Sequence, residues 1–422
     1  MKILLLDHPQ YTSATFFLWH GLKNLERATG GRLSVTCYPF MPTHYDADEY
    51  DLRDMPWWAE LSSWVETAKR HGAGLPRGTP EFQTNEPVTS QGETLMRRGY
   101  PWGKFPKENI CGDEASTVAL LKQWHFDLIV LGNSHRVSTI MLGRLRDLAG
   151  KLPPIVYLDA GERDELNEHW IHVFQPSLVF KQILTPEVLK KGLSCGIEGY
   201  KLRMYPLPLS SPLVDNPEIS FDGIPLRLLK ENSISRTKIL QVYYHLGNTW
   251  GPRAEIMKAV DGLVARRGLY RIGGVHYSDY HFLISKSRMA ITMRGSGRDT
   301  TRYWEIPLYK TAMVADGTMG CIHPYPFEHG KTALFWRSAD ELVQLVERYL
   351  SDSGGEAAEL ERIALAGQQH LARYHSTSAR AAFFLDIVQQ ELGVVDAALV
   401  EALGQWKTAA GWEDRPWSGP VV

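Results

Sequence analysis

Residues 289–315 constrain the fold most, because they hold two short apolar runs joined by a turn-rich loop and a helical segment. The runs at 289–293 (MAITM) and 312–315 (AMVA) are short and continuously apolar, and we expect both to be buried strands. The loop 294–300 (RGSGRDT) follows the first strand, and residues 301–309 are predicted to form a helix. Two strands joined through a helix make a βαβ unit with parallel strands. The expected fold class is therefore α/β.

The loop at residues 294–300 has the composition of an anion-binding site. Open α/β sheets bind ligands beyond the carboxyl ends of their strands, and this loop lies at such an end. Its glycines permit close backbone approach, and its arginines carry the positive charge that suits a phosphate. A helix that begins at Thr300 or Thr301 adds free N–H groups and a favourable dipole. We expect a diphosphate to contact these residues: Arg294, Ser296, Gly297, Arg298, Thr301 and Arg302.

Glu305 follows about one turn into the predicted helix. Its carboxylate would be close enough to that anion to accept hydrogen bonds from a neighbouring ribose. An ordinary structural explanation stands beside this one. Arginines at the start of a helix often form a solvated face, and Glu305 could lie on the helix surface.

A wider region, residues 236–388, resembles the donor-binding region of glycosyltransferases with the GT-B fold. The resemblance rests on features in a fixed order: Ser285-Lys286, the glycine loop, Arg302, Glu305 and a hydrophobic strand ending in Asp316. The region is similar to the bacterial CgeB-like group of the spore-maturation type and to glycosyltransferase family 1. The C-terminal half more loosely resembles exostosin-like enzymes.

The resemblance implies two Rossmann-like domains that face each other across a cleft. It implies that a nucleotide-sugar donor, UDP- or GDP-linked, binds as a substrate to the second domain, with no cofactor. It also implies that the first loop of this domain approaches the donor phosphate through Gly247 and Asn248. A plain turn between a strand and a helix would explain the same glycine.

The composition fits two globular domains and excludes several other classes of protein. With 422 residues, 44% of them hydrophobic and 22% charged, the chain is long enough for two cores. A net charge of −2 gives no strong signal for nucleic acid or an anionic membrane. The four cysteines include no CxxC pair, so neither a zinc site nor a disulfide framework is expected. We find no signal peptide and no apolar window of roughly 18 residues, and we expect a cytoplasmic protein without a transmembrane segment.

The first half of the chain repeats the alternation of strands and helices. A helix is predicted at 16–25, and strands are predicted at 2–6, 33–38, 126–131, 154–158, 173–184 and 202–207. The segment contains no GxGxxG sequence, so a dinucleotide cofactor is not indicated.

We divide the chain by its changes in pattern and composition. An N-terminal Rossmann-like acceptor domain is expected at 1–210, with an irregular, aromatic-rich insertion at 41–111. A proline-rich linker follows at 211–235, and a C-terminal Rossmann-like donor domain is expected at 236–390. The tail at 391–422 is expected to pack back on the first domain.

Polar residues follow several strands of the first domain, where an acceptor hydroxyl would meet the donor. Inverting sugar transfer needs a carboxylate or an imidazole to take the proton of that hydroxyl. We expect Asp159 and Glu162 to contact the acceptor or act as the base, with His8 as the next candidate. Asp164 and His135 are further candidates. Ordinary structural explanations are also open. The carboxylates at 159–164 could form the acidic first turn of a helix, and His8 could cap the loop before Pro9.

The expected activity is transfer of a sugar from a nucleotide-sugar to an acceptor hydroxyl, without a metal ion. The phosphate loop has arginines rather than paired aspartates, and no HExxH spacing is present. The alternatives are a non-catalytic binding protein on a GT-B scaffold and a sugar-nucleotide epimerase. The sequence leaves open the sugar, the base, the stereochemistry, the oligomeric state and the acceptor, which could be a glycan, a glycolipid, a protein or a modified nucleobase.

Overall fold

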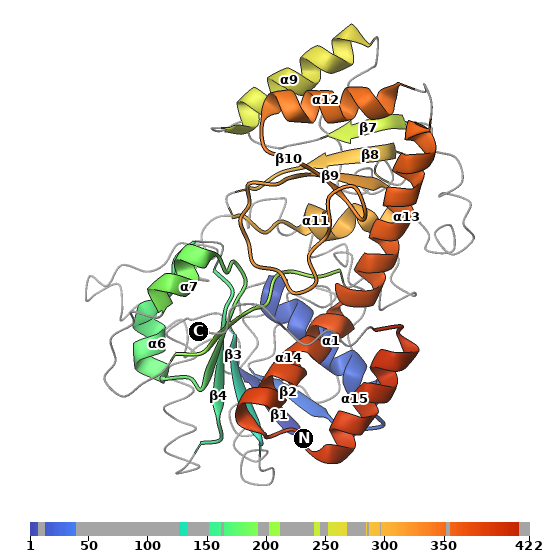
Figure 1. Ribbon diagram of the computed structural model, residues 1–422. Helices are drawn as coiled ribbons and strands as arrows, with labels where there is room; N and C mark the ends of the chain where they lie inside the picture. The colour runs from blue at the N-terminus through green and yellow to red at the C-terminus, as the bar shows by residue number, and fades with distance from the viewer. Residues whose placement is uncertain are drawn as a thin grey trace, which may run out of the picture.

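The computed structural model describes residues 1–6, 13–38, 126–132, 152–161, 164–192, 202–211, 240–244, 252–267, 284, 287–295, 297–351 and 355–412. These residues form two parallel sheets with helices packed against both faces (Figure 1). The expected α/β class with two Rossmann-like units is confirmed. The predicted insertion at 41–111 lies outside the described residues, and so does the predicted linker at 211–235 apart from Ser211.

The first sheet has six strands in the order β2-β1-β3-β4-β5-β6, and every neighbouring pair is parallel. The strands are β1 (Lys2–Leu6), β2 (Ser34–Tyr38), β3 (Leu128–Gly132), β4 (Ile155–Asp159), β5 (Leu178–Lys181) and β6 (Met204–Pro206). Strands covered on both faces are expected to read as continuous apolar runs, and the central strands β1, β3 and β4 do so apart from a terminal residue.

Alternate residues of this sheet belong to two separate cores. Ile3 and Leu5 pack with helix α1 (Ser13–Ala28) on one face, whereas Leu4 and Leu6 pack with residues of α6 (Glu168–Phe174) and α7 (Pro186–Gly192) on the other. Figure 1 shows α6 and α7 on the opposite side of the sheet from α1. The period-two alternation of a strand therefore builds a three-layer arrangement.

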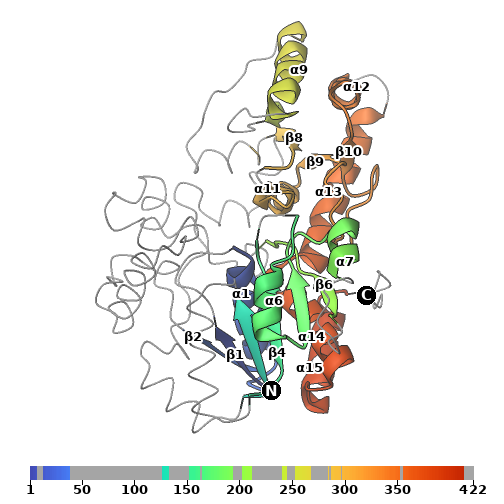
Figure 2. The ribbon, with the colours of Figure 1, turned by 90° about the vertical axis from the view of Figure 1, so that its left-hand side faces the viewer.

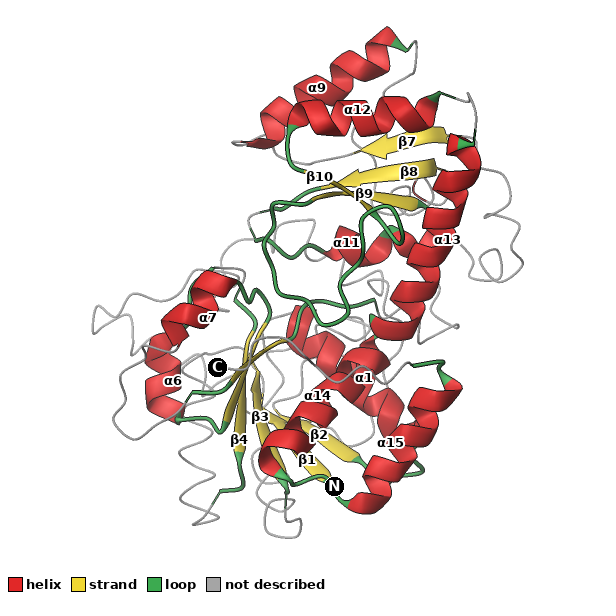
Figure 3. Ribbon diagram, in the orientation of Figure 1, coloured by secondary structure: helices red, strands yellow, loops and turns green. Residues whose placement is uncertain are grey.

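The second sheet has the strand order β10-β9-β8-β7, again with parallel pairs. Its strands are β7 (Leu240–Tyr244), β8 (Ser287–Thr292), β9 (Ala312–Asp316) and β10 (Leu334–Trp336). Helices α9 (Pro252–Arg266) and α12 (Ala339–Leu350) cover one face, and the short helix α11 (Thr301–Glu305) lies on the other (Figure 3). The predicted βαβ unit is therefore present as β8-α11-β9.

The C-terminal helices connect the two sheets. Helix α13 (Glu356–Tyr374) runs from the second sheet toward the first, where α14 (Thr377–Leu392) packs against α1 (Figures 1 and 2). The two helices approach so closely that a Cβ atom on Gly21 would lie 2.0 Å from the carbonyl oxygen of Thr377. Only glycine fits at that crossing. Packing on the first sheet thus begins with α14, ahead of the predicted boundary at residue 390.

The last described helix, α15 (Ala397–Ala409), also lies beside the first sheet (Figure 1). It was not predicted from the sequence, which indicated only a tail that packs back. Leu399 and Leu403 of this helix belong to the same core as α1 and α14. No helix in the described part of the chain is long and apolar enough to cross a membrane.

Two predicted elements differ from the structure. The strand predicted at 173–184 is only β5, because α6 extends to Phe174 and Gln175 then adopts a left-handed φ of 43°. The helix predicted at 301–309 is interrupted, so that α11 ends at Glu305 and a 3-10 helix follows at Pro307–Tyr309. Proline lacks a backbone N–H and clashes with the preceding turn, so it does not continue an α-helix.

Candidate functional site

A group of charged residues lies at the carboxyl edge of the second sheet. Strands β7 and β8 are parallel, with Tyr244 paired to Ile291, so the segments that follow them leave the sheet at the same edge. Arg294 follows β8, and Arg253 lies in the first turn of α9. The Nε atom of Arg253 donates a hydrogen bond of 3.0 Å to the carbonyl oxygen of Arg294. The first turn of α9 is thereby joined to the segment that follows β8.

Gly295 allows this approach of Arg253 to the loop. A Cβ atom at Gly295 would lie 3.2 Å from Nη2 of Arg253, which is tighter than ordinary van der Waals contact. The glycine that was expected to admit a ligand therefore admits an arginine side chain. Arg253 thus brings positive charge to the backbone of the loop from a helix that precedes β8 in the sequence.

The electrostatics bring Arg302 and Glu305 into the same group. Burial lowers the pKa of Arg253, and the neighbouring charge of Arg302 lowers that pKa further. Burial raises the pKa of Tyr243 to about 12, while Arg302 opposes this shift and Glu305 adds to it. At this edge, Arg302 thus acts on Arg253, and Arg302 and Glu305 both act on Tyr243. Like charges gathered in a half-buried place are typical of a site that binds an anion.

Glu305 is a buried carboxylate, with only 5% of its surface exposed. The alternative that it lies on the helix surface is therefore wrong. Glutamate is almost never fully buried unless it is paired, so the carboxylate of Glu305 is expected to be held in place by neighbouring groups. Its charge also reaches Tyr309, whose pKa is raised first by burial and then by Glu305.

Helix α11 has only five residues, and its N-cap residue Thr300 makes no side-chain capping hydrogen bond. The dipole of so short a helix is small. The expectation that the helix N-terminus would hold the anion at Thr301 is therefore weakened. Positive charge at this edge comes from arginine side chains.

Arg298 makes contacts that the sequence did not indicate. Its Nε atom forms an ion pair with Asp164, which lies between β4 and α6 of the first sheet, and its Nη1 atom donates 2.8 Å to the carbonyl oxygen of Met319. The two side chains are partly exposed, at 27% and 40%. This arginine therefore links the two halves of the molecule, and its contact with a phosphate stays a prediction.

Asp159 lies at the end of β4 and is buried together with Lys181 of β5. The strand register pairs these two residues, and Lys181 Nζ is 3.1 Å from Asp159 Oδ1. The carboxylate also accepts hydrogen bonds from the backbone N–H groups of Gly161 (3.2 Å) and Asn167 (3.3 Å). Lys181 donates 3.1 Å to the carbonyl oxygen of Gly161. This pair holds the shape of the loop after β4, and the geometry favours that role for Asp159 over acceptor contact.

The structure thus brings together only some of the predicted site residues. Arg294, Arg302 and Glu305 lie in the group at the carboxyl edge of the second sheet. Gly297 lies in the loop after β8, where its carbonyl oxygen accepts a 2.9 Å hydrogen bond from the N–H of Gly295. Six predicted residues lie outside the described part of the chain: His8, His135, Glu162, Gly247, Asn248 and Ser296.

Arg253 and Tyr243 were not among the predicted site residues. The sequence could have indicated Arg253, because it follows Pro252 in the first turn of a helix after a glycine-containing segment. For Tyr243, the sequence indicated only a position in a strand. Among the described residues, no group of three or more His, Cys, Asp or Glu side chains could hold a metal ion.

Comparison with known protein families identifies the second half of the chain. Residues 235–386, which contain the whole of the second sheet, match the family described as "Glycosyl transferase-like". This part of the chain is a glycosyltransferase domain, and the glycosyltransferase predicted from the sequence is confirmed. The match does not distinguish the CgeB-like or exostosin-like groups.

Several solved structures have similar chain traces. A glycosyltransferase from Rickettsia africae is 11% identical over 93% of this chain and 98% of its own, with a TM-score of 0.49. An E. coli protein described as trehalose-6-phosphate bound with UDP-2-fluoro glucose is 10% identical over 92% and 99%, with a TM-score of 0.48. Anabaena Alr3699/HepE in complex with UDP-glucose is 12% identical over 92% and 100%, with a TM-score of 0.46. At these values our fold assignment rests on the two sheets themselves. No curated protein matches the sequence.

Proposed function

We propose that this glycosyltransferase binds a UDP- or GDP-linked sugar at the carboxyl edge of the second sheet and works without a metal ion. Arg253 and Arg302 would contact the diphosphate, and Glu305 would accept hydrogen bonds from the ribose. The observation that carries the proposal is that Arg253 is hydrogen-bonded to the loop after β8 and is influenced by the charge of Arg302, which lies on the same short helix as the buried Glu305. A diphosphate would relieve the repulsion between the two cations and offset charge on the leaving group.

The acceptor is proposed to meet the donor from the first sheet, through the loops that follow its strands. What favours Glu162 over Asp159 as the base is that both oxygens of Asp159 are taken up by Lys181 and by backbone N–H groups. His8 stays the next candidate. The predicted cytoplasmic location stays a prediction, and the acceptor stays unassigned.

Nucleoside diphosphates are expected to stabilise the protein in a thermal-shift assay. UDP, GDP, ADP and CMP at millimolar concentration form the test set, with UDP or GDP giving the largest rise in melting temperature. Arg253→Ala and Arg302→Ala should each raise the dissociation constant for UDP or GDP roughly 10- to 100-fold, which is the effect expected from losing one charge-assisted hydrogen bond. Glu305→Gln should reduce the preference for UDP over 2′-deoxy-UDP.

The matched control is Arg266→Ala at the other end of α9, where the side chain is 60% exposed and pairs with Glu347. Its removal also deletes one arginine from α9 but should leave nucleotide affinity unchanged. Absence of stabilisation by every nucleotide would overturn the donor site. An equal loss of affinity in Arg266→Ala would show that only net charge matters.

Turnover is expected to persist after treatment with EDTA. Slow hydrolysis of UDP- and GDP-sugars, followed by release of the free nucleotide, supplies an assay before the acceptor is known. A binding scaffold without chemistry would release none. A strict requirement for added manganese would contradict the metal-independent mechanism, in which arginines offset the charge of the leaving group.

A further inference from the structure

Helix α11 carries Arg302 and Glu305, yet it is too short to hold its own position. It has five residues, whereas an isolated helix needs about 12–15 to be even marginally stable in water. Its position must therefore come from tertiary contacts. The contacts converge on Trp304, the residue next to Glu305, which is 1% exposed.

Trp304 is held from two sides by charged groups. Its Nε1 atom donates a hydrogen bond of 2.8 Å to Oδ1 of Asp299. The guanidinium carbon of Arg380 lies 5.0 Å from the centroid of the Trp304 ring, within the range of a cation–π interaction. Asp299 and Arg380 are themselves buried, at 5% and 2% exposure.

Both charged residues also connect α11 to the first half of the molecule. Asp299 accepts, through Oδ2, a 2.7 Å hydrogen bond from the backbone N–H of Leu209, just after β6. Arg380 belongs to α14, the helix that packs on α1. The indole of Trp304 is thus placed relative to the first sheet by two independent attachments.

The charge of Arg380 is preserved despite its burial. Burial lowers the pKa of Arg380 to about 9, and the charge of Asp299 opposes that shift. The Nη2 atom of Arg380 lies 2.7 Å from Nδ1 of His375. Since arginine only donates, Nδ1 accepts and the imidazole is neutral. Burial and the charge of Arg380 lower the pKa of His375 accordingly.

Stability alone does not explain why two opposite charges are buried beside one ring. Asp299 and Arg380 each contact Trp304, and their charges attract each other. Buried opposite charges are often no more stabilising than apolar residues of similar volume, because both charges must leave water. What the charges add is direction: a hydrogen-bond acceptor at a fixed atom and a guanidinium over one ring face. A five-residue helix cannot fix its own orientation, and the orientation of α11 decides where its ligand-binding side chains lie.

We propose that Asp299 and Arg380 are positioning residues for the donor site, which clamp Trp304 and thereby set Arg302 and Glu305 relative to the first sheet. Neither residue contacts the donor in this proposal. The inference rests on the proposed donor site for its effect on binding, but the clamp itself can be tested without any ligand.

The test compares Asp299→Asn, Arg380→Met and the double variant. Each single variant removes one of two buried opposite charges that attract each other and should lower the melting temperature, whereas the double variant should recover part of that loss. The dissociation constant for UDP or GDP should rise roughly tenfold in Arg380→Met, the lower end of the loss of one charge-assisted hydrogen bond, and should stay raised in the double variant. Arg380→Lys, which keeps the cation, should restore part of the affinity.

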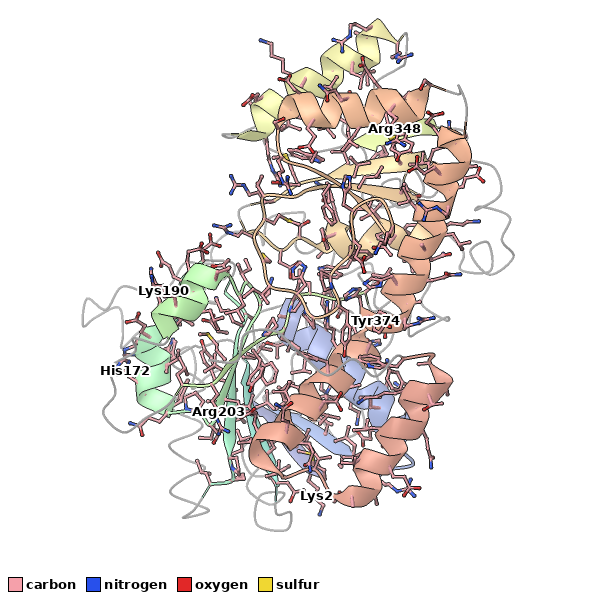
Figure 4. All side chains as sticks on the ribbon, viewed as in Figure 1. Lys2, His172, Lys190, Arg203, Arg348 and Tyr374 are labelled. Carbon is pink, nitrogen blue, oxygen red and sulfur yellow. The ribbon has the colours of Figure 1, made fainter. Side chains whose placement is uncertain are left out.

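A ligand-free measurement keeps the clamp separate from the proposed function. Amide hydrogen exchange of residues 301–306 should speed up roughly tenfold or more in Arg380→Met and in the double variant, because local opening becomes easier. The control is Arg348→Met on α12, whose guanidinium lies at the same 5.0 Å from the ring of Tyr349 but on the other face of the second sheet (Figure 4). It should change neither exchange nor affinity.

The outcomes separate the two proposals. Faster exchange at 301–306 with no nucleotide binding even in the wild type would support the clamp and overturn the donor site. Unchanged exchange in the double variant would overturn the clamp, whatever the affinities. Full recovery of affinity together with melting temperature in the double variant would also overturn it, because Asp299 and Arg380 would then matter only for stability.

Discussion

Replacing Lys181 by methionine is expected to destabilise the protein by about 3–5 kcal/mol, the usual result of removing one partner of a buried ion pair. Lys181 and Asp159 are 1% and 3% exposed, so the remaining carboxylate would stay out of water without its counter-charge. The loop after β4 would also lose the bond from Lys181 to the Gly161 carbonyl oxygen. Urea unfolding at neutral pH measures the effect through the change in midpoint.

Arg203→Met is the matched control for this prediction. Arg203, labelled in Figure 4, pairs with Glu391 at 2.8 Å within the same half of the molecule. Its side chain is 31% exposed. A partly exposed pair of this kind contributes about 0–1 kcal/mol. If both variants lost the same small amount of stability, Asp159 and Lys181 would not be a buried pair in solution.

Glu162→Gln is expected to reduce turnover about 100-fold or more while leaving the affinity for the donor nucleotide unchanged. A general base contributes typically 10²–10⁴-fold to the rate, and glutamine does not take up a proton. Turnover and nucleotide affinity should be measured side by side, with His8→Gln included as the second candidate. Asp159→Asn should act mainly on stability, because Asp159 holds the loop after β4.

Glu165→Gln serves as the control, since Glu165 is an exposed carboxylate in the same loop region. It should retain normal turnover. The anomeric configuration of the product must be determined first, because a retaining enzyme needs no single protein base. For an inverting enzyme, normal turnover in both Glu162→Gln and His8→Gln would show that the base lies elsewhere.

The central strands were predictable because each contains a short apolar run, and burial on both faces requires that composition. The βα order around residues 289–315 then predicted the sheet edge where the charged group lies. Helix α11 was overestimated because the helical spacing continued past Glu305, although Pro307 stops an α-helix.

The partners of Asp159 and Arg298 were not predictable, because they depend on distances between segments far apart in the chain. Asp159 meets Lys181 only through the register of β4 with β5. Arg298 meets Asp164 only when the two sheets are placed beside each other. Residue type indicated that carboxylates and arginines gather at strand ends, but it did not indicate which of them neutralise one another.

The close crossing of α1 and α14 also bears on how the chain is made. His20 of α1 lies 2.6 Å from the hydroxyl of Thr377, a contact between residues 357 positions apart. During synthesis, helix α14, which packs on α1, therefore emerges from the ribosome only after almost the whole chain has been made. Until then, the apolar surface formed by α1 and the first sheet stays exposed. The second sheet has all of its described strands by residue 336, so it can assemble earlier. The N-terminal half is synthesised first but completes its folding last. Before α14 packs on it, its exposed apolar surface is the part of the chain that we expect a chaperone to bind.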